Sequence, residues 1–165
     1  MHFLLRASGA QIMKPVLAIG LGNPLMGDDG VGCVVAERLA SDSRLPEYAE
    51  VICGGSDLLG CAGQMEGRSR VLVIDAIQRD TELGSVVTFE GARSGLDEHQ
   101  DHAHHLSAIQ AIRLLEMIRS IRCTLLGISI SSVALGTGLS PELDAGIPAI
   151  LNRVLQELGR PLEVL

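Results

Sequence analysis

Aromatic residues are nearly absent from this 165-residue sequence, which has two phenylalanines, one tyrosine and no tryptophan. Proteins that bind single-stranded nucleic acid stack the bases on aromatic side chains, so the composition argues against that role. Positive charge is also scarce, because 13 lysines and arginines stand against 20 aspartates and glutamates, a formal charge of −7. Phosphate backbones are bound by clustered Lys and Arg, so we expect no nucleic-acid partner.

Long apolar runs and paired cysteines are missing as well. No run approaches the roughly 18 apolar residues that a membrane span needs, and the first residues lack the basic and apolar regions of a signal peptide. The four cysteines are scattered and form no C-x-x-C pair, a usage typical of reduced thiols in the cytoplasm. We therefore expect a soluble cytoplasmic protein that makes no membrane contact, with a monomer as the default state.

Aliphatic residues dominate what is present, and at 47% hydrophobic content the chain can form the core of one domain. Apolar runs predict strands, and amphipathic or capped segments between them predict helices. The predicted strands cover 15–19, 50–53, 70–75, 85–89 and 123–130, and the predicted helices cover 28–40, 58–65, 104–119 and a last one that Ser140 caps and Gly159 ends. We predict a flexible N-terminal extension at 1–13 and a single domain at 14–165.

This order of elements predicts an α/β fold. It is a three-layer sandwich with a mostly parallel sheet of about five strands and helices on both faces. The link between strands 70–75 and 85–89 is too short and polar for a crossover helix, so the later strand is predicted to be antiparallel and near an edge. In the helix at 104–119 we expect the following side chains to be buried: Leu106, Ile109, Ile112, Leu115 and Met117.

Three groups of polar residues fall where ligands bind in such sheets, outside the carboxyl ends of the strands. Asp28 and Asp29 follow the first strand, Asp75 ends a buried strand, and His104 opens a helix. We assign Asp28 as the helix N-cap and Asp29 as the functional carboxylate. Each residue also has a structural explanation, since an aspartate at a strand end anchors loops and a histidine-rich tract is ordinarily solvated.

Together these residues form a set with metal-binding chemistry. Two carboxylates and a neutral imidazole suit zinc, nickel and similar divalent ions. A helix N-terminus favours the ionised form of Asp29 and disfavours a protonated His104, which keeps both in the ligand form. Other catalytic patterns fail, because the sequence contains neither G-x-S-x-G nor H-E-x-x-H.

Five motifs in their order along the chain resemble those of the hydrogenase maturation proteases, which process the large subunit of [NiFe] hydrogenases. The similarity extends from about Lys14 to Leu158. The motifs are Gly20-Leu21-Gly22-Asn23 continuing to Asp28-Asp29-Gly30-Val31-Gly32, then Gly54-Gly55-Ser56 with Leu58-Leu59-Gly60, Val73-Ile74-Asp75-Ala76, His104-His105-Leu106-Ser107, and Gly138-Leu139-Ser140-Pro141-Glu142.

The resemblance implies a metal-dependent endopeptidase that removes the C-terminal extension of a hydrogenase large-subunit precursor after nickel insertion. By motif, the family's ligands become Asp29, Asp75 and His104. It also implies that these catalytic residues engage the nickel of the precursor, and that zinc or another divalent ion can occupy the same positions.

Other interpretations remain open at this stage. Gly20-Leu21-Gly22-Asn23-Pro24 also resembles the start of bacterial peptidyl-tRNA hydrolases, but Asp28-Asp29 stand where that family continues differently and the chain is acidic. A nucleotide-binding module would use Gly20 and Gly22, although an acidic pair repels pyrophosphate. A non-enzymatic metal carrier would use the tract 98–105 and would bind several ions weakly.

Overall fold

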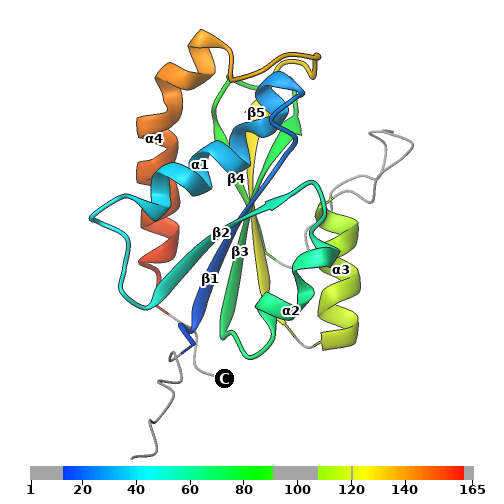
Figure 1. The fold of residues 1–165 in the computed structure, drawn as a ribbon, viewed down its shortest axis with the longest axis vertical. Coiled ribbons are helices and arrows are strands. Elements are labelled where there is room, and N and C mark those ends of the chain that lie inside the picture. The colour runs from blue at the N-terminus through cyan, green and yellow to red at the C-terminus, as the bar shows by residue number, and fades with distance from the viewer. Residues whose placement is uncertain (1–12, 91–107, 120, 162–165) are drawn as a thin grey trace, which may run out of the picture.

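The computed structural model describes residues 13–90, 108–119 and 121–161. One sheet runs through these residues, with strand order β2-β1-β3-β5-β4 (Figure 1). The strands are β1 (Val16–Leu21), β2 (Ala49–Gly55), β3 (Arg70–Gln78), β4 (Val86–Glu90) and β5 (Cys123–Ile130). Neighbouring strands are parallel except β4, which pairs antiparallel with β5 at the edge. The predicted α/β sheet and its antiparallel edge strand are thus confirmed.

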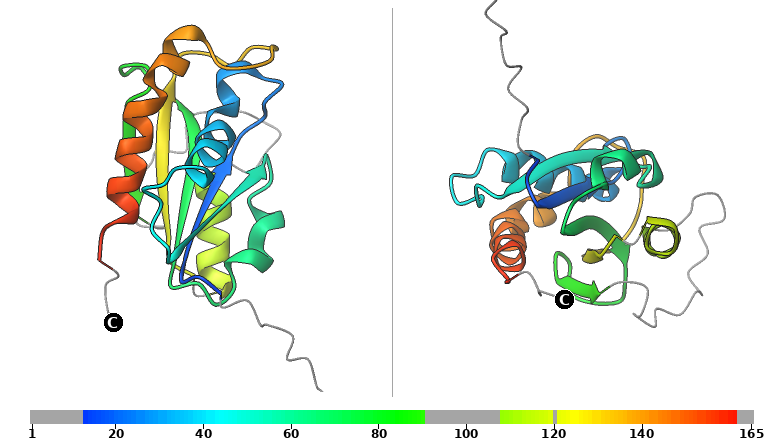
Figure 2. Two further views of the ribbon diagram at one scale, coloured as in Figure 1. Left: turned by 60° about the vertical axis from the view of Figure 1, so that its left-hand side comes forward. Right: turned by 90° about the horizontal axis from the view of Figure 1, so that it is seen from below.

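Helices cover both faces of the sheet (Figures 1 and 2). The helical elements are the 3₁₀ turns η1 (Gly27–Gly30) and η2 (Leu59–Cys61) and the helices α1 (Val31–Ala40), α2 (Ala62–Met65), α3 (Ala108–Arg119) and α4 (Pro141–Leu158). Side chains alternate along each strand, so Leu72 and Ile74 pack with α1 and α4, whereas Val71 and Val73 pack with α2 and α3. Two aliphatic cores result, one on each face.

Local expectations were met unevenly. The last strand has its predicted bounds, and Ser140 caps α4 by accepting a hydrogen bond from Leu143 N–H at 3.4 Å. The expected helix at 58–65 is a 3₁₀ turn followed by one α-helical turn, with no side-chain cap. Met117, expected to be buried, is 82% exposed. A helix places residues two apart on opposite sides, and Leu115 already faces the core.

Two further expectations concern the termini and membranes. Residues 1–12 of the predicted extension lie outside the described ranges, and the described part of the chain forms one sheet with its flanking helices. Among the helices that the structure describes, none combines the length and apolar character needed to cross a bilayer.

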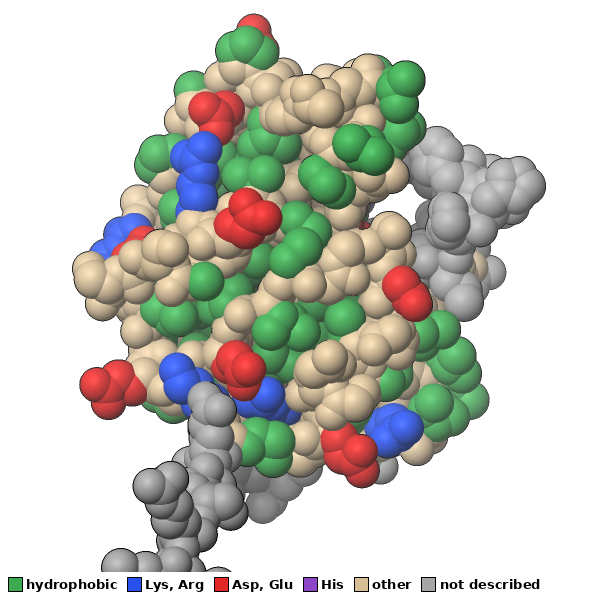
Figure 3. Space-filling model, in the orientation of Figure 1, with side chains coloured by type: hydrophobic (Ala, Val, Ile, Leu, Met, Phe, Trp, Pro, Cys, Tyr) green, Lys and Arg blue, Asp and Glu red, His purple; other side chains and the backbone are tan. Residues whose placement is uncertain are grey.

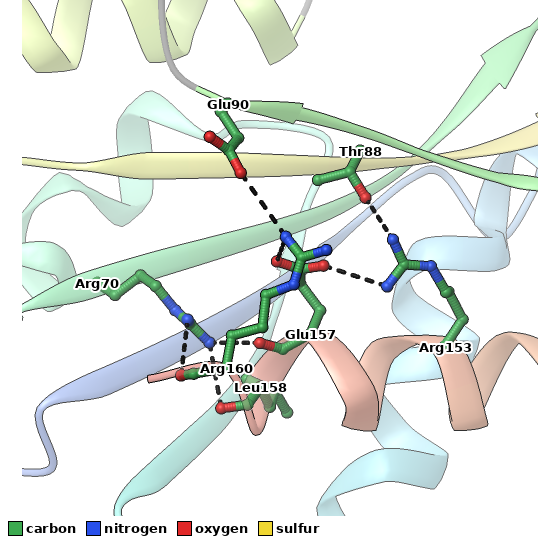
Figure 4. Close-up of polar contacts among 7 residues, drawn as sticks. All are labelled: Arg70, Thr88, Glu90, Arg153, Glu157, Leu158 and Arg160. Atoms are coloured by element: carbon green, nitrogen blue, oxygen red, sulfur yellow. Dashed lines mark hydrogen bonds and ion pairs between the residues drawn. The ribbon is translucent and has the colours of Figure 1, made fainter. Parts of the chain in front are cut away.

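Three arginines hold the end of α4 against the sheet (Figure 4). Glu157 is buried, and its carboxylate pairs with Arg153 at 3.2 Å and Arg160 at 3.0 Å. Arg153 also donates to Thr88 Oγ1 on β4 at 2.9 Å. Arg70 on β3 donates to the main-chain carbonyls of residues 157, 158 and 160, at 2.7, 3.2 and 3.3 Å. These bonds satisfy carbonyl groups that a helix C-terminus otherwise leaves unpaired.

Replacing Glu157 with alanine is expected to lower the free energy of unfolding by about 2 to 3 kcal/mol. Removing one member of a buried ion pair costs about 3–5 kcal/mol when the remaining charge stays buried. Here Arg153 and Arg160 are 32% and 50% exposed, so water partly compensates them. Urea unfolding would measure the change.

Glu66→Ala is the matched control, because Glu66 is 72% exposed in its ion pair with Arg119. Exposed pairs contribute less than about 1 kcal/mol. Equal losses in the two variants would contradict the structural role assigned to Glu157.

Candidate active site

The carboxyl end of the sheet brings together segments that are far apart in the sequence. The turn after β1 forms η1, which carries Asp28 and Asp29 and leads into α1. Gly32, in the first turn of α1, lies against the main chain of both β1 and β3. A Cβ at this position would come within 3.0 Å of the carbonyl oxygens of Leu21 and Ile74. This close packing, which only glycine allows, brings the start of α1 next to Asp75 on β3.

Asp75 does not end its strand as predicted. β3 continues to Gln78 because β5 runs alongside it, and Asp75 pairs in register with Gly127. The carboxylate is largely enclosed and accepts a hydrogen bond from Ala76 N–H at 2.8 Å. Burial raises the pKa of Asp75 to about 7, the bond from Ala76 opposes this shift, and the negative charge of Asp29 adds to it.

Asp29 is held by the turn that precedes it. Its Oδ2 accepts a hydrogen bond from Asn23 N–H at 3.0 Å, and Asn23 Oδ1 accepts from Leu25 N–H at 3.0 Å. Asp29 remains partly exposed. A single backbone donor leaves most of the acceptor capacity of this carboxylate unused.

Asp28 has a different role from the predicted helix N-cap. Neither η1 nor α1 has a side-chain cap. The 3₁₀ turn delays the start of α1 to Val31. Asp28 is instead buried and accepts two hydrogen bonds from Ser140, from N–H at 2.6 Å and from Oγ at 2.9 Å. It therefore ties the turn after β1 to the start of α4. Asp29, the next residue, makes no such bond to α4, and its charge acts on Asp75.

His104 lies outside the described residues, as do the other four histidines of the chain. Within the described ranges, no group of three or more His, Cys, Asp and Glu side chains is arranged to hold a metal ion. That finding leaves the predicted set of Asp29, Asp75 and His104 untested. Of this set, Asp29 and Asp75 lie close enough for the charge of Asp29 to raise the pKa of Asp75.

Three of the four cysteines are unsuited to act as a nucleophile. Cys33, Cys61 and Cys123 are buried, and only Cys53 is exposed. Burial raises the pKa of both Cys33 and Cys123 to about 12 and also raises that of Cys61. Because the thiolate is the reactive form, these three buried thiols are unreactive at neutral pH.

Sequence reasoning missed the loop at 131–139 as part of this end of the molecule. The loop follows β5 and ends at Ser140, so it lies beside the turn after β1. Gly27 N–H donates to Gly136 O, and Gly136 N–H donates to Leu25 O, both at 3.0 Å. Ser140 was recognised as a helix cap, but the sequence contains no signal for a bond to an aspartate 112 residues away.

The comparisons with known proteins agree on one family. A sequence profile described as hydrogenase maturation protease matches residues 33–157. The hydrogenase 2 maturation protease of Escherichia coli K12 is 29% identical over 156 residues, which span 87% of this chain and 90% of that protein.

Solved structures are similar over nearly the whole chain. A hydrogenase 2 maturation peptidase from Thaumarchaeota archaeon SCGC_AB-539-E09 is 30% identical with a TM-score of 0.67, covering 91% of this chain and all of that one. The [NiFe] hydrogenase maturation protease HycI from Thermococcus kodakarensis has a TM-score of 0.73 at 19% identity, covering 89% and 94% of the two chains. The latter similarity concerns the fold alone.

Proposed function

This chain belongs to the hydrogenase maturation protease family, and on that premise we propose that it removes the C-terminal extension of a [NiFe] hydrogenase large-subunit precursor after nickel insertion. The proposed substrate is the nickel-loaded precursor, whose metal would be bound by Asp29, Asp75 and His104. Family membership removes the reason to pursue the peptidyl-tRNA hydrolase and nucleotide-module alternatives. Action as a cytoplasmic monomer stays a prediction.

The convergence of Asp29 and Asp75 is the observation that supports this proposal. Two carboxylates near the carboxyl end of the sheet repel each other, and the charge of Asp29 contributes to the raised pKa of Asp75. A divalent cation relieves this repulsion and stabilises both ionised forms. The same pair without a cation is an electrostatic cost to the fold, so a role in cation binding accounts for its presence.

His104 would complete the set from the segment before α3. α3 packs on the face of the sheet to which Val71 and Val73 of β3 point. Because side chains alternate along a strand, Asp75 belongs to the same face. α3 also runs antiparallel to β5, so its first turn is nearer than its last to the carboxyl end of the sheet (Figure 1). Asp75 lies toward that end of β3.

Three protein ligands leave coordination positions for groups that the precursor itself supplies. Nickel bound in this way would license cleavage, because only a loaded precursor can occupy the site. A metal ion also polarises a carbonyl oxygen or lowers the pKa of bound water towards 7. Asp29 and Asp75 would position the metal beside the scissile bond.

A processing assay with matched precursors tests the proposal. The wild-type protein is expected to shorten a nickel-loaded precursor and to leave a nickel-free one intact. Asp29→Asn and His104→Ala should each reduce processing and Ni²⁺ affinity at least about 100-fold, since each removes a ligand. Mass spectrometry of the precursor and calorimetric Ni²⁺ titration would measure these effects.

Asp28→Asn provides the control, because Asp28 faces Ser140 and not Asp75. It should retain a single Ni²⁺ site. Equal cleavage of nickel-free precursor would contradict the licensing role. Ni²⁺ binding that survives Asp29→Asn, Asp75→Asn and His104→Ala would support the carrier alternative.

A further inference from the structure

Two loops at the carboxyl end of the sheet form one connected structure. The two hydrogen bonds of Gly136, with Leu25 and with Gly27, pair Met26 and Gly136 in an isolated parallel bridge. Asp28 ties Ser140, at the end of the second loop, to the first loop. The segments 23–28 and 131–140 therefore hold each other in place by backbone and buried side-chain bonds.

These loops expose large apolar side chains. Leu25 is 60% exposed, Leu135 87% and Val133 38%, and these three residues define the apical patch. Every residue from 131 to 138 is exposed, and neither that segment nor 23–27 contains a charged side chain. Hydrophobic side chains gather accordingly at the upper right of the view, over this end of the molecule (Figure 3). In a chain with 20% charged residues, such an uncharged exposed surface is a feature of an interface.

The position of the apical patch indicates its partner. Leu25 is four residues before Asp29, and both bond to Asn23. Leu25 and Asp29 therefore belong to one hydrogen-bonded turn, so a protein that presents its metal to Asp29 approaches the exposed Leu25 side chain. A surface without charge favours an uncharged, apolar segment in the partner over an acidic or basic one.

We propose that the apical patch of Leu25, Val133 and Leu135 is the docking surface for an apolar, uncharged segment of the nickel-loaded precursor. This inference rests on the proposed function, since it takes the precursor as the protein that brings metal to Asp29. The patch supplies affinity for the protein around the metal, and the carboxylates recognise the metal itself. Recognition is then divided between two neighbouring surfaces.

Leu25→Ser and Leu135→Ser test the docking surface. Each is expected to raise KM for the nickel-loaded precursor, and Kd of its complex, about tenfold, with kcat lowered less than twofold. Both side chains are exposed in the free protein, so unfolding by urea should change little. Ni²⁺ affinity of the free protein should also stay unchanged, because neither residue is one of the proposed ligands.

Met117→Ser is the matched control. Met117 is 82% exposed on α3, away from the two loops, and the substitution removes a similar apolar side chain. It should leave KM and Kd at wild-type values. Unchanged KM and Kd in the patch variants, or an equal rise in Met117→Ser, would overturn the docking surface while leaving the proposed function intact.

A second copy of this chain is the competing occupant of the apical patch. A wild-type dimer in light scattering that becomes monomeric in Leu135→Ser, with KM unchanged, would assign the patch to a second copy of this chain and overturn the proposal. A nickel-loaded precursor that the wild-type protein neither binds nor cleaves would overturn the proposed function and the docking surface together.

Discussion

Replacing Asp75 with asparagine is expected to stabilise the folded protein at pH 8 while abolishing processing of the precursor. Asparagine retains an oxygen that can accept the hydrogen bond from Ala76 N–H. It lacks the charge that burial and Asp29 oppose. The substitution therefore separates the contribution of Asp75 to function from its cost to stability.

The sign of the effect follows from the raised pKa of Asp75, about 7 in the folded protein against an ordinary 3.8. Below pH 3.8 the carboxyl is protonated in both states, so it adds no penalty. Between pH 3.8 and 7 only the unfolded chain ionises, and stability is lost as pH rises. Above pH 7 the loss is complete, at most about 4 kcal/mol for a shift of about three pKa units.

Urea unfolding of the wild type and Asp75→Asn at pH 4, 6 and 8 would measure this difference. The two proteins should have similar stability at pH 4, and the variant should be more stable by up to about 4 kcal/mol at pH 8. Added Ni²⁺ should stabilise the wild type at pH 8 and not the variant, since binding to the folded state alone raises its stability. If the free energy of unfolding changed with pH in the same way in both proteins, Asp75 would be freely solvated. Normal processing by the variant would exclude Asp75 from the site.

Much of the fold could be predicted because local patterns determine it. The strand 123–130 is rich in leucine and isoleucine, and Ser140 followed by Pro141 is a helix start that depends on adjacent residues only. The antiparallel edge strand was likewise predicted from the length and polarity of one link. In each case the signal lies within the segment that it describes.

The expectations that failed around the candidate site depend on contacts between distant segments. β3 extends beyond Asp75 because β5 supplies partners as far as Gln78. Asp28 binds Ser140 and caps no helix, because the turn after β1 meets the loop after β5. The loop 131–139 was overlooked for the same reason, since its place beside Asp29 arises from the sheet order alone. Sequence patterns therefore predicted Asp29 and Asp75 as site residues but carried no signal for the loop beside them.

Gly32→Ala is expected to have the largest effect on stability, a loss of at least about 3 kcal/mol. Alanine is the better helix former by about 0.5–1 kcal/mol, so helix propensity alone would predict a gain. At Gly32, however, the new Cβ would meet the backbone of β1 and of β3, neither of which can rotate away. Overpacking a tight interior typically costs about 1–3 kcal/mol, and a clash with two main chains lies at or beyond the top of that range.

Gly146→Ala is the matched control, because it makes the same change inside α4 where a Cβ would meet nothing within 4 Å. It should stabilise the protein by about 0.5–1 kcal/mol in the same urea titration. A comparable gain for Gly32→Ala would show that α1 does not pack on the sheet as described.

Gly32→Ala also tests how the candidate site is assembled. To accept a Cβ at position 32, the start of α1 must move away from β3, and Asp29 would move with it. The repulsion between Asp29 and Asp75 would then weaken, so the pKa of Asp75 should fall slightly in any variant that still folds, since burial is the main cause of its rise. Displacement of a ligand by about 1 Å can cost on the order of 100-fold in activity. Gly32→Ala would thus reduce Ni²⁺ affinity although residue 32 does not contact the metal, whereas Gly146→Ala should leave that affinity unchanged.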